Sequence, residues 1–184
     1  GSKDAFAELM NEKARELGLE DTHYVTPSGL DADGHYSSAY DLAILAAYAL
    51  ENPDFREICC KESAKVEFGN PPYGRWLKNH NKLLNLYPYA IGVKTGYTDD
   101  AKRCLVTAAQ KDGVTLIAVT LAAQDDFNVH QKLYERYFGE LTQQDLTPAL
   151  PDLELPVTGG QAATVGLEPV RPPVAALRAG ERDR

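Results

Sequence analysis

Apolar side chains recur every three or four positions in three segments of the chain, which is the spacing of a helix with one buried face. Residues 3–17 are the first of these segments, with Ser2 placed to cap the start and Gly18 to end it. Asn52 and Pro53 predict the start of a short further helix, because Asn is a good cap and Pro fits the first helical position. The predicted helices cover residues 3–17, 39–50, 53–60 and 127–138.

Four other segments have the composition and spacing of strands. Residues 114–121 are nearly all apolar, which predicts a central strand covered on both faces. Lys111-Asp112-Gly113 comes just before this segment and predicts a hairpin turn to the preceding strand. The predicted strands cover residues 65–68, 91–95, 103–109 and 114–121, residues 70–74 form a turn, and residues 76–86 give no secure prediction.

The composition changes near residue 140. Six of the eleven prolines fall within residues 148–184, where short alternating runs at 153–155 and 163–165 predict small strands. We therefore expect two domains: residues 1–147 form the first, and residues 148–184 form the beginning of a β-rich second domain.

Charge and composition limit the classes of function. The 184 residues carry 19 Lys and Arg against 27 Asp and Glu, a formal net charge of −8. This balance argues against a nucleic-acid partner and against a polybasic membrane patch, and no stretch approaches the ~20 apolar residues of a membrane span. The chain begins with Gly1 and has neither an initiator Met nor a signal-peptide pattern, so we expect it to be a piece of a longer protein.

Cysteine and histidine spacing predicts no metal site. Cys59, Cys60 and Cys104 are odd in number and form no C-x-x-C pair, and the four histidines form no H-E-x-x-H motif. No cofactor is implied. Several other polar or aromatic residues are expected to be structural: His35 near a helix start, Asp99-Asp100 and Asp125-Asp126 as solvated loop ends, Tyr87-Pro88-Tyr89 as packing residues, and Glu51 at a helix end.

The triplet Lys94-Thr95-Gly96 carries the chemistry that the sequence shows best. An ammonium near a strand edge can pair with a carboxylate, and the neighbouring hydroxyl can hydrogen-bond the same group. Glycine leaves room for a ligand to approach the backbone closely. K-T-G is also one of three signatures of penicillin-binding proteins and class A β-lactamases, beside S-x-x-K and S-D-N.

Several wider stretches of the chain also match the segments of one protein family in their order and spacing. They are Phe6–Asn11, Leu17–Leu19, Thr26–Leu30, His35–Ala43, Asn79–Leu84, Gly92–Thr98 and Cys104–Val106. Together they resemble the serine-type D-alanyl-D-alanine carboxypeptidases, the low-molecular-mass penicillin-binding proteins, over about residues 1–140. The tail to residue 184 resembles the start of that family's C-terminal β-domain more loosely. The resemblance implies the mixed α/β fold of β-lactamases and transpeptidases, an antiparallel sheet flanked by helices, here incomplete.

The resemblance also implies an activity. Members of the family remove the terminal D-Ala from peptidoglycan stem peptides through an acyl-serine intermediate, and β-lactams inhibit them covalently. The family acts outside the cytoplasmic membrane, so the resemblance implies the same location here. By resemblance, Lys94 and Thr95 would hold the terminal carboxylate, Gly96 would let the ligand lie against the strand, and the backbone N–H of Tyr97 would be half of the oxyanion hole.

The nucleophile of that reaction is missing from the chain. The five serines are Ser2, Ser28, Ser37, Ser38 and Ser63, and none of them begins an S-x-x-K or S-x-N motif. We therefore expect the chain to be inactive alone, with both motifs in a missing N-terminal part of the same protein.

Two alternatives remain. One is a class A β-lactamase, which needs an E-x-x-L-N stretch. Leu84-Asn85 is the one Leu-Asn pair of the chain, and the position three residues before Leu84 holds Asn81 in place of the required Glu. The other is a non-catalytic wall-binding relative.

Overall fold

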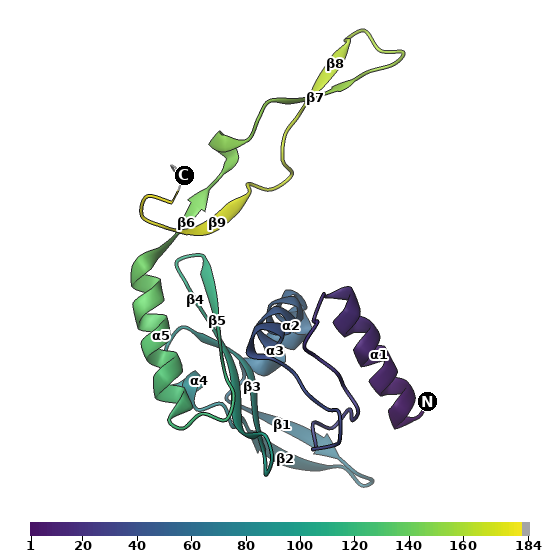
Figure 1. Cartoon of the computed structure of the whole chain (residues 1–184), viewed down its shortest axis with the longest axis vertical. Helices are drawn as coiled ribbons and strands as arrows, with labels where there is room; N and C mark the ends of the chain where they lie inside the picture. The colour runs from purple at the N-terminus through teal and green to yellow at the C-terminus, as the bar shows by residue number, and fades with distance from the viewer. Residues whose placement is uncertain (182–184) are drawn as a thin grey trace. The chain divides into compact units, whose positions relative to one another are not determined.

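The computed structural model describes residues 1–181 and divides the chain into two compact units. Unit 1 consists of residues 1–111 and 115–136, and unit 2 consists of residues 112–114 and the chain from residue 137 onward. Figure 1 shows the course of the chain and the element labels. The division at 136/137 lies earlier than the predicted domain boundary at 147/148, which stays a prediction.

The helices of the structure are α1 (Lys3–Glu16), α2 (Ala39–Glu51), α3 (Pro53–Cys59), α4 (Leu83–Leu86) and α5 (Asp126–Glu140). Side-chain caps explain why three of them begin where they do. Ser2 Oγ accepts a hydrogen bond from the Ala5 N–H at 3.1 Å, and Ser38 Oγ caps α2 in the same way. Asn52 Oδ1 accepts from the first two free N–H groups of α3. The four predicted helices are confirmed, with ends shifted by one or two residues.

Unit 1 contains a three-stranded sheet and a separate hairpin. The sheet has the order β3-β4-β5, formed by β3 (Ala90–Thr98), β4 (Lys102–Lys111) and β5 (Val114–Thr120). Asp112 and Gly113 connect β4 to β5 with φ of 49° and 80°, the left-handed pair that a tight hairpin turn requires. The hairpin consists of β1 (Ser63–Phe68) and β2 (Tyr73–Lys78), paired in antiparallel register.

The order of the sheet corrects one prediction. In the described part of the chain, β4 is the central strand and β5 lies at an edge, so the central position predicted for residues 114–121 is wrong there. The burial of side chains agrees with the central position of β4, because its residues Leu105, Ala108 and Ala109 are almost completely buried. The prediction failed because apolar content shows that a strand is covered but does not give its neighbours in the sheet.

Unit 2 consists of two small antiparallel ribbons. The first pairs β6 (Leu141–Asp145) with β9 (Val174–Arg178), and the second pairs β7 (Leu153–Pro156) with β8 (Thr164–Leu167). A short 3-10 turn spans Thr147–Ala149. The predicted small strands at 153–155 and 163–165 correspond to β7 and, one residue later, to β8. Among the described helices of the whole chain, none combines the length and the apolar character needed to cross a bilayer.

Candidate functional site

The predicted ligand-binding residues Lys94, Thr95, Gly96 and Tyr97 all lie in the second half of β3. Among the described strands, β3 is an edge strand that pairs only with β4. Backbone groups alternate between the two sides of a strand, so Thr95 and Tyr97 direct their N–H and C=O groups to the same side. The strand can therefore present a pair of backbone groups and a row of side chains to one ligand.

Lys94 carries an exposed positive charge on this strand. Its Nζ donates a hydrogen bond to the carbonyl oxygen of the next residue, Thr95. No carboxylate within residues 1–181 forms an ion pair with this ammonium. An exposed cation without an internal counter-ion remains available for the carboxylate of a ligand.

The two glycines of β3 differ in what surrounds them. A Cβ on Gly92 would lie 2.7 Å from Cys59 Sγ, and the φ of 152° at this position disfavours any L side chain. A Cβ on Gly96 would meet nothing closer than the Cys104 carbonyl oxygen at 3.8 Å. The fold therefore requires glycine at position 92, whereas a Cβ at position 96 would fit in ordinary van der Waals contact with Cys104, so the fold itself does not require glycine there.

The start of β3 is held in place by the segment that joins the hairpin to α4. Asn81 is buried, and its Nδ2 donates a hydrogen bond of 2.9 Å to the Gly92 carbonyl. Asn79 Nδ2 donates to the carbonyls of Cys59 at 3.3 Å and Lys61 at 3.0 Å, just after α3. These amides tie α3, α4 and β3 together, so they position the ligand-binding strand without belonging to it.

Cys59 contributes to the same junction. Its Sγ donates a hydrogen bond of 3.4 Å to the Ile91 carbonyl at the start of β3. Burial raises the pKa of this thiol, which keeps it protonated and inert near neutral pH. Cys104 lies on β4 opposite Gly96 and donates to the Ala101 carbonyl, also at 3.4 Å.

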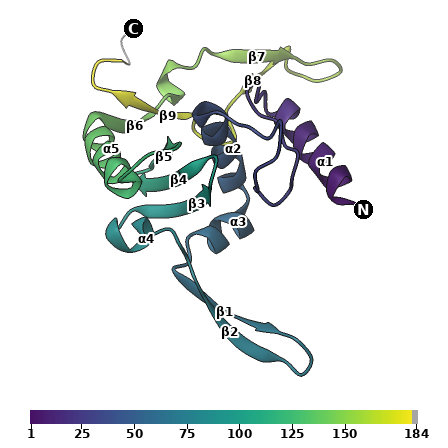
Figure 2. The same cartoon turned by 60° about the horizontal axis from the view of Figure 1, so that its bottom comes forward.

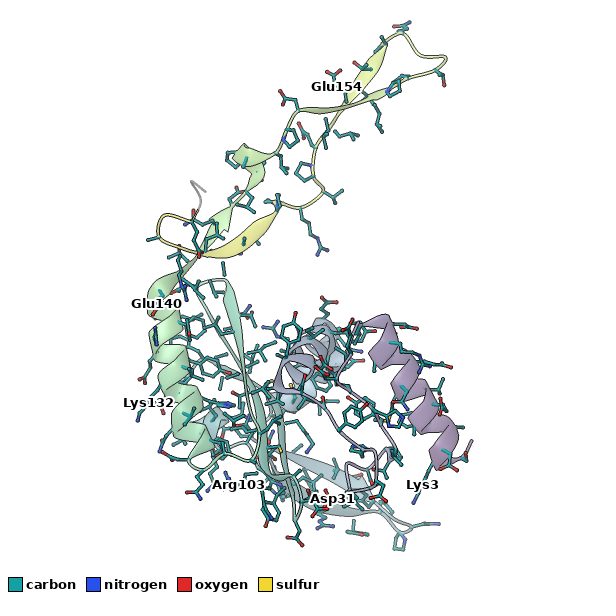
Figure 3. The ribbon with its side chains drawn as sticks, viewed as in Figure 1. Lys3, Asp31, Arg103, Lys132, Glu140 and Glu154 are labelled. Atoms are coloured by element: carbon teal, nitrogen blue, oxygen red, sulfur yellow. The ribbon has the colours of Figure 1, made fainter. Side chains whose placement is uncertain are left out.

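The far end of β3 lies beside an ion pair between the half-exposed Arg103 and the buried Asp126. Arg103 pairs with Tyr97 in the β3–β4 register, and its Nη2 lies 2.7 and 3.0 Å from the two carboxylate oxygens of Asp126. Asp126 is only 3% exposed and also accepts from the Phe127 N–H at the start of α5. The prediction that Asp126 is a solvated loop end is therefore wrong. Figure 3 labels Arg103 at the end of the sheet next to the first turn of α5.

A buried polar network links β4, β5 and α5, and sequence reasoning missed it. Thr107 Oγ1 lies 2.7 Å from both His130 Nδ1 and the Tyr134 hydroxyl, and His130 Nε2 lies 3.1 Å from Thr120 Oγ1. Burial lowers the pKa of His130 from 6.5 to about 4, partly opposed by the Asp126 carboxylate. The only sequence signal was the spacing of four residues between His130 and Tyr134, which fits an ordinary buried helix face equally well.

His35 and Tyr87 have structural roles. His35 Nδ1 accepts hydrogen bonds from the backbone of Val25 and Thr26, which fixes the loop before α2. Tyr87 is buried and stacks on Tyr134 with ring centroids 5.7 Å apart, as expected for a packing residue. Within the described residues, no three His, Cys, Asp or Glu side chains are grouped so that they could hold a metal ion.

Comparison with known proteins gives a consistent family. The family model described as D-alanyl-D-alanine carboxypeptidase matches residues 1–125. The chain is 41% identical over 129 residues to D-alanyl-D-alanine carboxypeptidase DacF of Bacillus subtilis strain 168. The aligned region covers 67% of this chain and 31% of DacF. The chain is 31% identical over 214 aligned residues to DacD of Escherichia coli K12, covering 98% of this chain and 54% of DacD.

A solved structure agrees with the sequence comparisons. The crystal structure of a D-alanyl-D-alanine carboxypeptidase from Mycobacterium tuberculosis H37Rv is similar with a TM-score of 0.69 and 34% identity, covering 76% of this chain and 55% of that one. The predicted mixed α/β fold is confirmed by this likeness. The chain thus spans between about a third and about half of the length of these curated relatives. By its sequence match and its fold, the chain belongs to the D-alanyl-D-alanine carboxypeptidase family.

Proposed function

We propose that this chain supplies the carboxylate-binding strand of a D-alanyl-D-alanine carboxypeptidase of peptidoglycan. The substrate is a stem peptide that ends in D-Ala-D-Ala, and its terminal D-Ala leaves after a serine attacks the preceding carbonyl. The observation that carries the proposal is the exposed Lys94 ammonium on an edge strand, beside Thr95 and the exposed Gly96.

Lys94, Thr95 and Tyr97 each have a distinct task in this proposal. The Lys94 ammonium leaves the Thr95 carbonyl and pairs with the terminal carboxylate of the substrate, and the Thr95 hydroxyl donates to the same group. The backbone N–H of Tyr97 donates to the oxygen of the attacked carbonyl as negative charge develops on it. One such donor is worth roughly 3–4 kcal/mol of transition-state stabilisation in other hydrolases.

The nucleophile comes from outside these residues in this proposal, because no serine of the chain begins an S-x-x-K motif. Acylation by a substrate or by a β-lactam therefore requires the part of the protein that carries that motif. The family is typically extracytoplasmic, and we propose the same location for the protein to which this chain belongs.

The structure does not favour β-lactamase chemistry. Class A enzymes release the acyl group with a Glu that would stand at position 81, where this chain has Asn. The Asn81 amide is already used on both sides, because its Nδ2 donates to the Gly92 carbonyl and its Oδ1 accepts from the Leu83 N–H. An amide cannot act as a general base, so rapid hydrolysis of an acyl-enzyme finds no support here.

Non-covalent binding tests the proposal on the chain itself. The ligand is an Nα-acetylated peptide ending in D-Ala-D-Ala, compared with the same peptide as its C-terminal amide. We expect the free acid to shift the backbone amide NMR signals of residues 94–97, and the C-terminal amide to shift them little. Lys94→Ala should weaken binding of the acid about tenfold or more, because a hydrogen bond to a charged group is worth ~1.5–3 kcal/mol.

Lys132→Ala is the matched control, since Lys132 is an α5 residue outside β3, and it should leave binding unchanged. Equal binding of the acid and the amide peptide, or binding that is insensitive to Lys94, would refute the carboxylate site. A fluorescent penicillin should not become covalently attached to the chain, and attachment would reveal a nucleophile that the motifs do not show.

A further inference from the structure

A hollow lies where the base of the β1–β2 hairpin approaches α4, and no residue of β3 lines it. Its volume is about 270 Å³, and its walls are Glu62, Ser63, Trp76, Leu77, Lys78 and Asn85. Figure 2 shows the hairpin projecting from the rest of unit 1. We call this feature the hairpin hollow.

Trp76 is the most unusual residue that lines the hairpin hollow, because its large side chain is exposed. It is the one tryptophan of the chain, and 70% of it is exposed although it lies in a regular strand. Its cross-strand partner is Lys65, and no ring contact or side-chain hydrogen bond within residues 1–181 uses the indole. A large exposed ring that makes no such contact with the described residues is typical of a binding surface.

The polar side chains that line the hairpin hollow also have no partners among the described residues. The side chains of Glu62, Lys78 and Asn85 form no hydrogen bond or ion pair with other described residues. They offer a carboxylate acceptor, an ammonium donor and an amide that both donates and accepts. The hairpin hollow therefore combines one flat apolar ring with both kinds of hydrogen-bonding group within one small volume.

We propose that the hairpin hollow binds a saccharide ring, stacked on the Trp76 indole and hydrogen-bonded through its hydroxyl or amide groups to Glu62, Lys78 and Asn85. A sugar has an apolar C–H face and a polar edge that both donates and accepts, so it matches both parts of the wall. Ligand pockets usually measure ~300–1,000 Å³, and a volume of about 270 Å³ fits a single ring. The Glu62 carboxylate and the net charge of −8 disfavour a nucleic-acid backbone.

A short chain segment and the hydrogen bonds of its side chains connect the hairpin hollow to the Lys94 strand. Lys78 precedes Asn79, which binds the end of α3, and Asn81 binds the Gly92 carbonyl of β3. The identity of the sugar rests on the proposed function: stem peptides are attached to glycan strands of N-acetylated amino sugars. A sugar held here would keep such a strand on the same compact unit as the peptide site.

The single tryptophan makes the test direct. We expect a trimer of β-1,4-linked N-acetylglucosamine to change the Trp76 fluorescence of the full chain in a saturable way, and cellotriose, which lacks the acetamido groups, to bind more weakly. Trp76→Ala should weaken binding of the N-acetylglucosamine trimer about tenfold or more by calorimetry. Trp76→Phe, which keeps a ring, should retain part of the affinity.

Tyr73→Ala is the matched control, because Tyr73 is an exposed aromatic residue of the same strand outside the hairpin hollow. It should change the affinity less than twofold. Lys94→Ala should leave the fluorescence response to the N-acetylglucosamine trimer intact while it weakens binding of the D-Ala-D-Ala peptide, so the two proposals can fail separately.

No response to the amino-sugar trimer, or binding that survives Trp76→Ala in a chain with unchanged circular dichroism, would overturn the proposal. A fluorescence response to a stem peptide without any sugar that persists in Lys94→Ala would overturn it in favour of a peptide site in the hairpin hollow.

Discussion

The buried imidazole of His130 should make the chain lose stability as the pH falls from neutral. In the folded chain burial lowers its pKa to about 4, whereas the unfolded chain has the ordinary value of 6.5. Between these values the unfolded state binds a proton that the native state rejects, so protonation favours unfolding. At ~1.36 kcal/mol per pKa unit, the full effect is roughly 3 kcal/mol, present at pH 7 and lost progressively between about pH 6.5 and pH 4.

The structure explains why the native state rejects this proton. The neutral ring offers one donor and one acceptor, and it faces one threonine hydroxyl on each side, Thr107 on β4 and Thr120 on β5. A second ring proton would require both hydroxyls to accept, and Thr107 already shares its hydroxyl with Tyr134. The Asp126 carboxylate is the nearby charge that favours the proton, but burial outweighs it.

Urea unfolding followed by circular dichroism between pH 7.5 and pH 4 measures this loss. His130→Gln is the reference variant, because its amide can hydrogen-bond the same hydroxyls but does not titrate. The variant is expected to be less stable at pH 7 and to lose less stability on acidification, since other groups contribute equally to both chains. If the two chains lose stability in parallel over this range, the imidazole is not buried neutral and the reasoning is wrong.

Further substitutions test three separate parts of the framework. Gly92→Ala should cost at least ~2 kcal/mol of folding free energy by urea unfolding, because of left-handed backbone strain and the contact with Cys59 Sγ. Gly96→Ala should change the folding free energy by no more than ~1 kcal/mol and should weaken only the binding of the D-Ala-D-Ala peptide. Thr107→Val leaves the buried partners of its hydroxyl unsatisfied and should cost ~2–3 kcal/mol by the same assay, and a smaller cost than ~1 kcal/mol would contradict the network. Arg103→Met leaves the Asp126 carboxylate buried without its ion pair and should cost ~1–2 kcal/mol, because Arg103 itself is half exposed, and Asp126→Asn should recover part of the loss in the double variant.

Local signals were sufficient for the elements that local chemistry fixes. Ser2, Ser38 and Asn52 each accept the hydrogen bonds that start a helix, and the Asp112-Gly113 turn adopts the left-handed pair that joins two strands. The predicted strand 91–95 lies within β3, which continues past the whole K-T-G triplet to Thr98. These features depend on a few neighbouring residues, so the sequence alone contains the information that determines them.

Features that depend on distant residues could not be predicted in the same way. β2 begins at Tyr73 in a stretch of mixed polarity, and it is a strand because β1 pairs with it along its whole length. Asp126 looks like a solvated residue until Arg103, 23 positions earlier, is placed beside it. In both cases the tertiary partner, and not the local pattern, decides the environment.

The β3 strand shows why the ligand-binding residues cannot be separated from their support by mutation alone. Changing Asn81 or Gly92 would disturb the start of the strand, and with it the positions of Lys94 and Gly96, without removing any group that we propose to touch a ligand. Loss of binding in such a variant therefore identifies a positioning residue only if folding stability falls as well. A variant that loses binding at unchanged stability, as expected for Gly96→Ala, identifies the ligand surface itself.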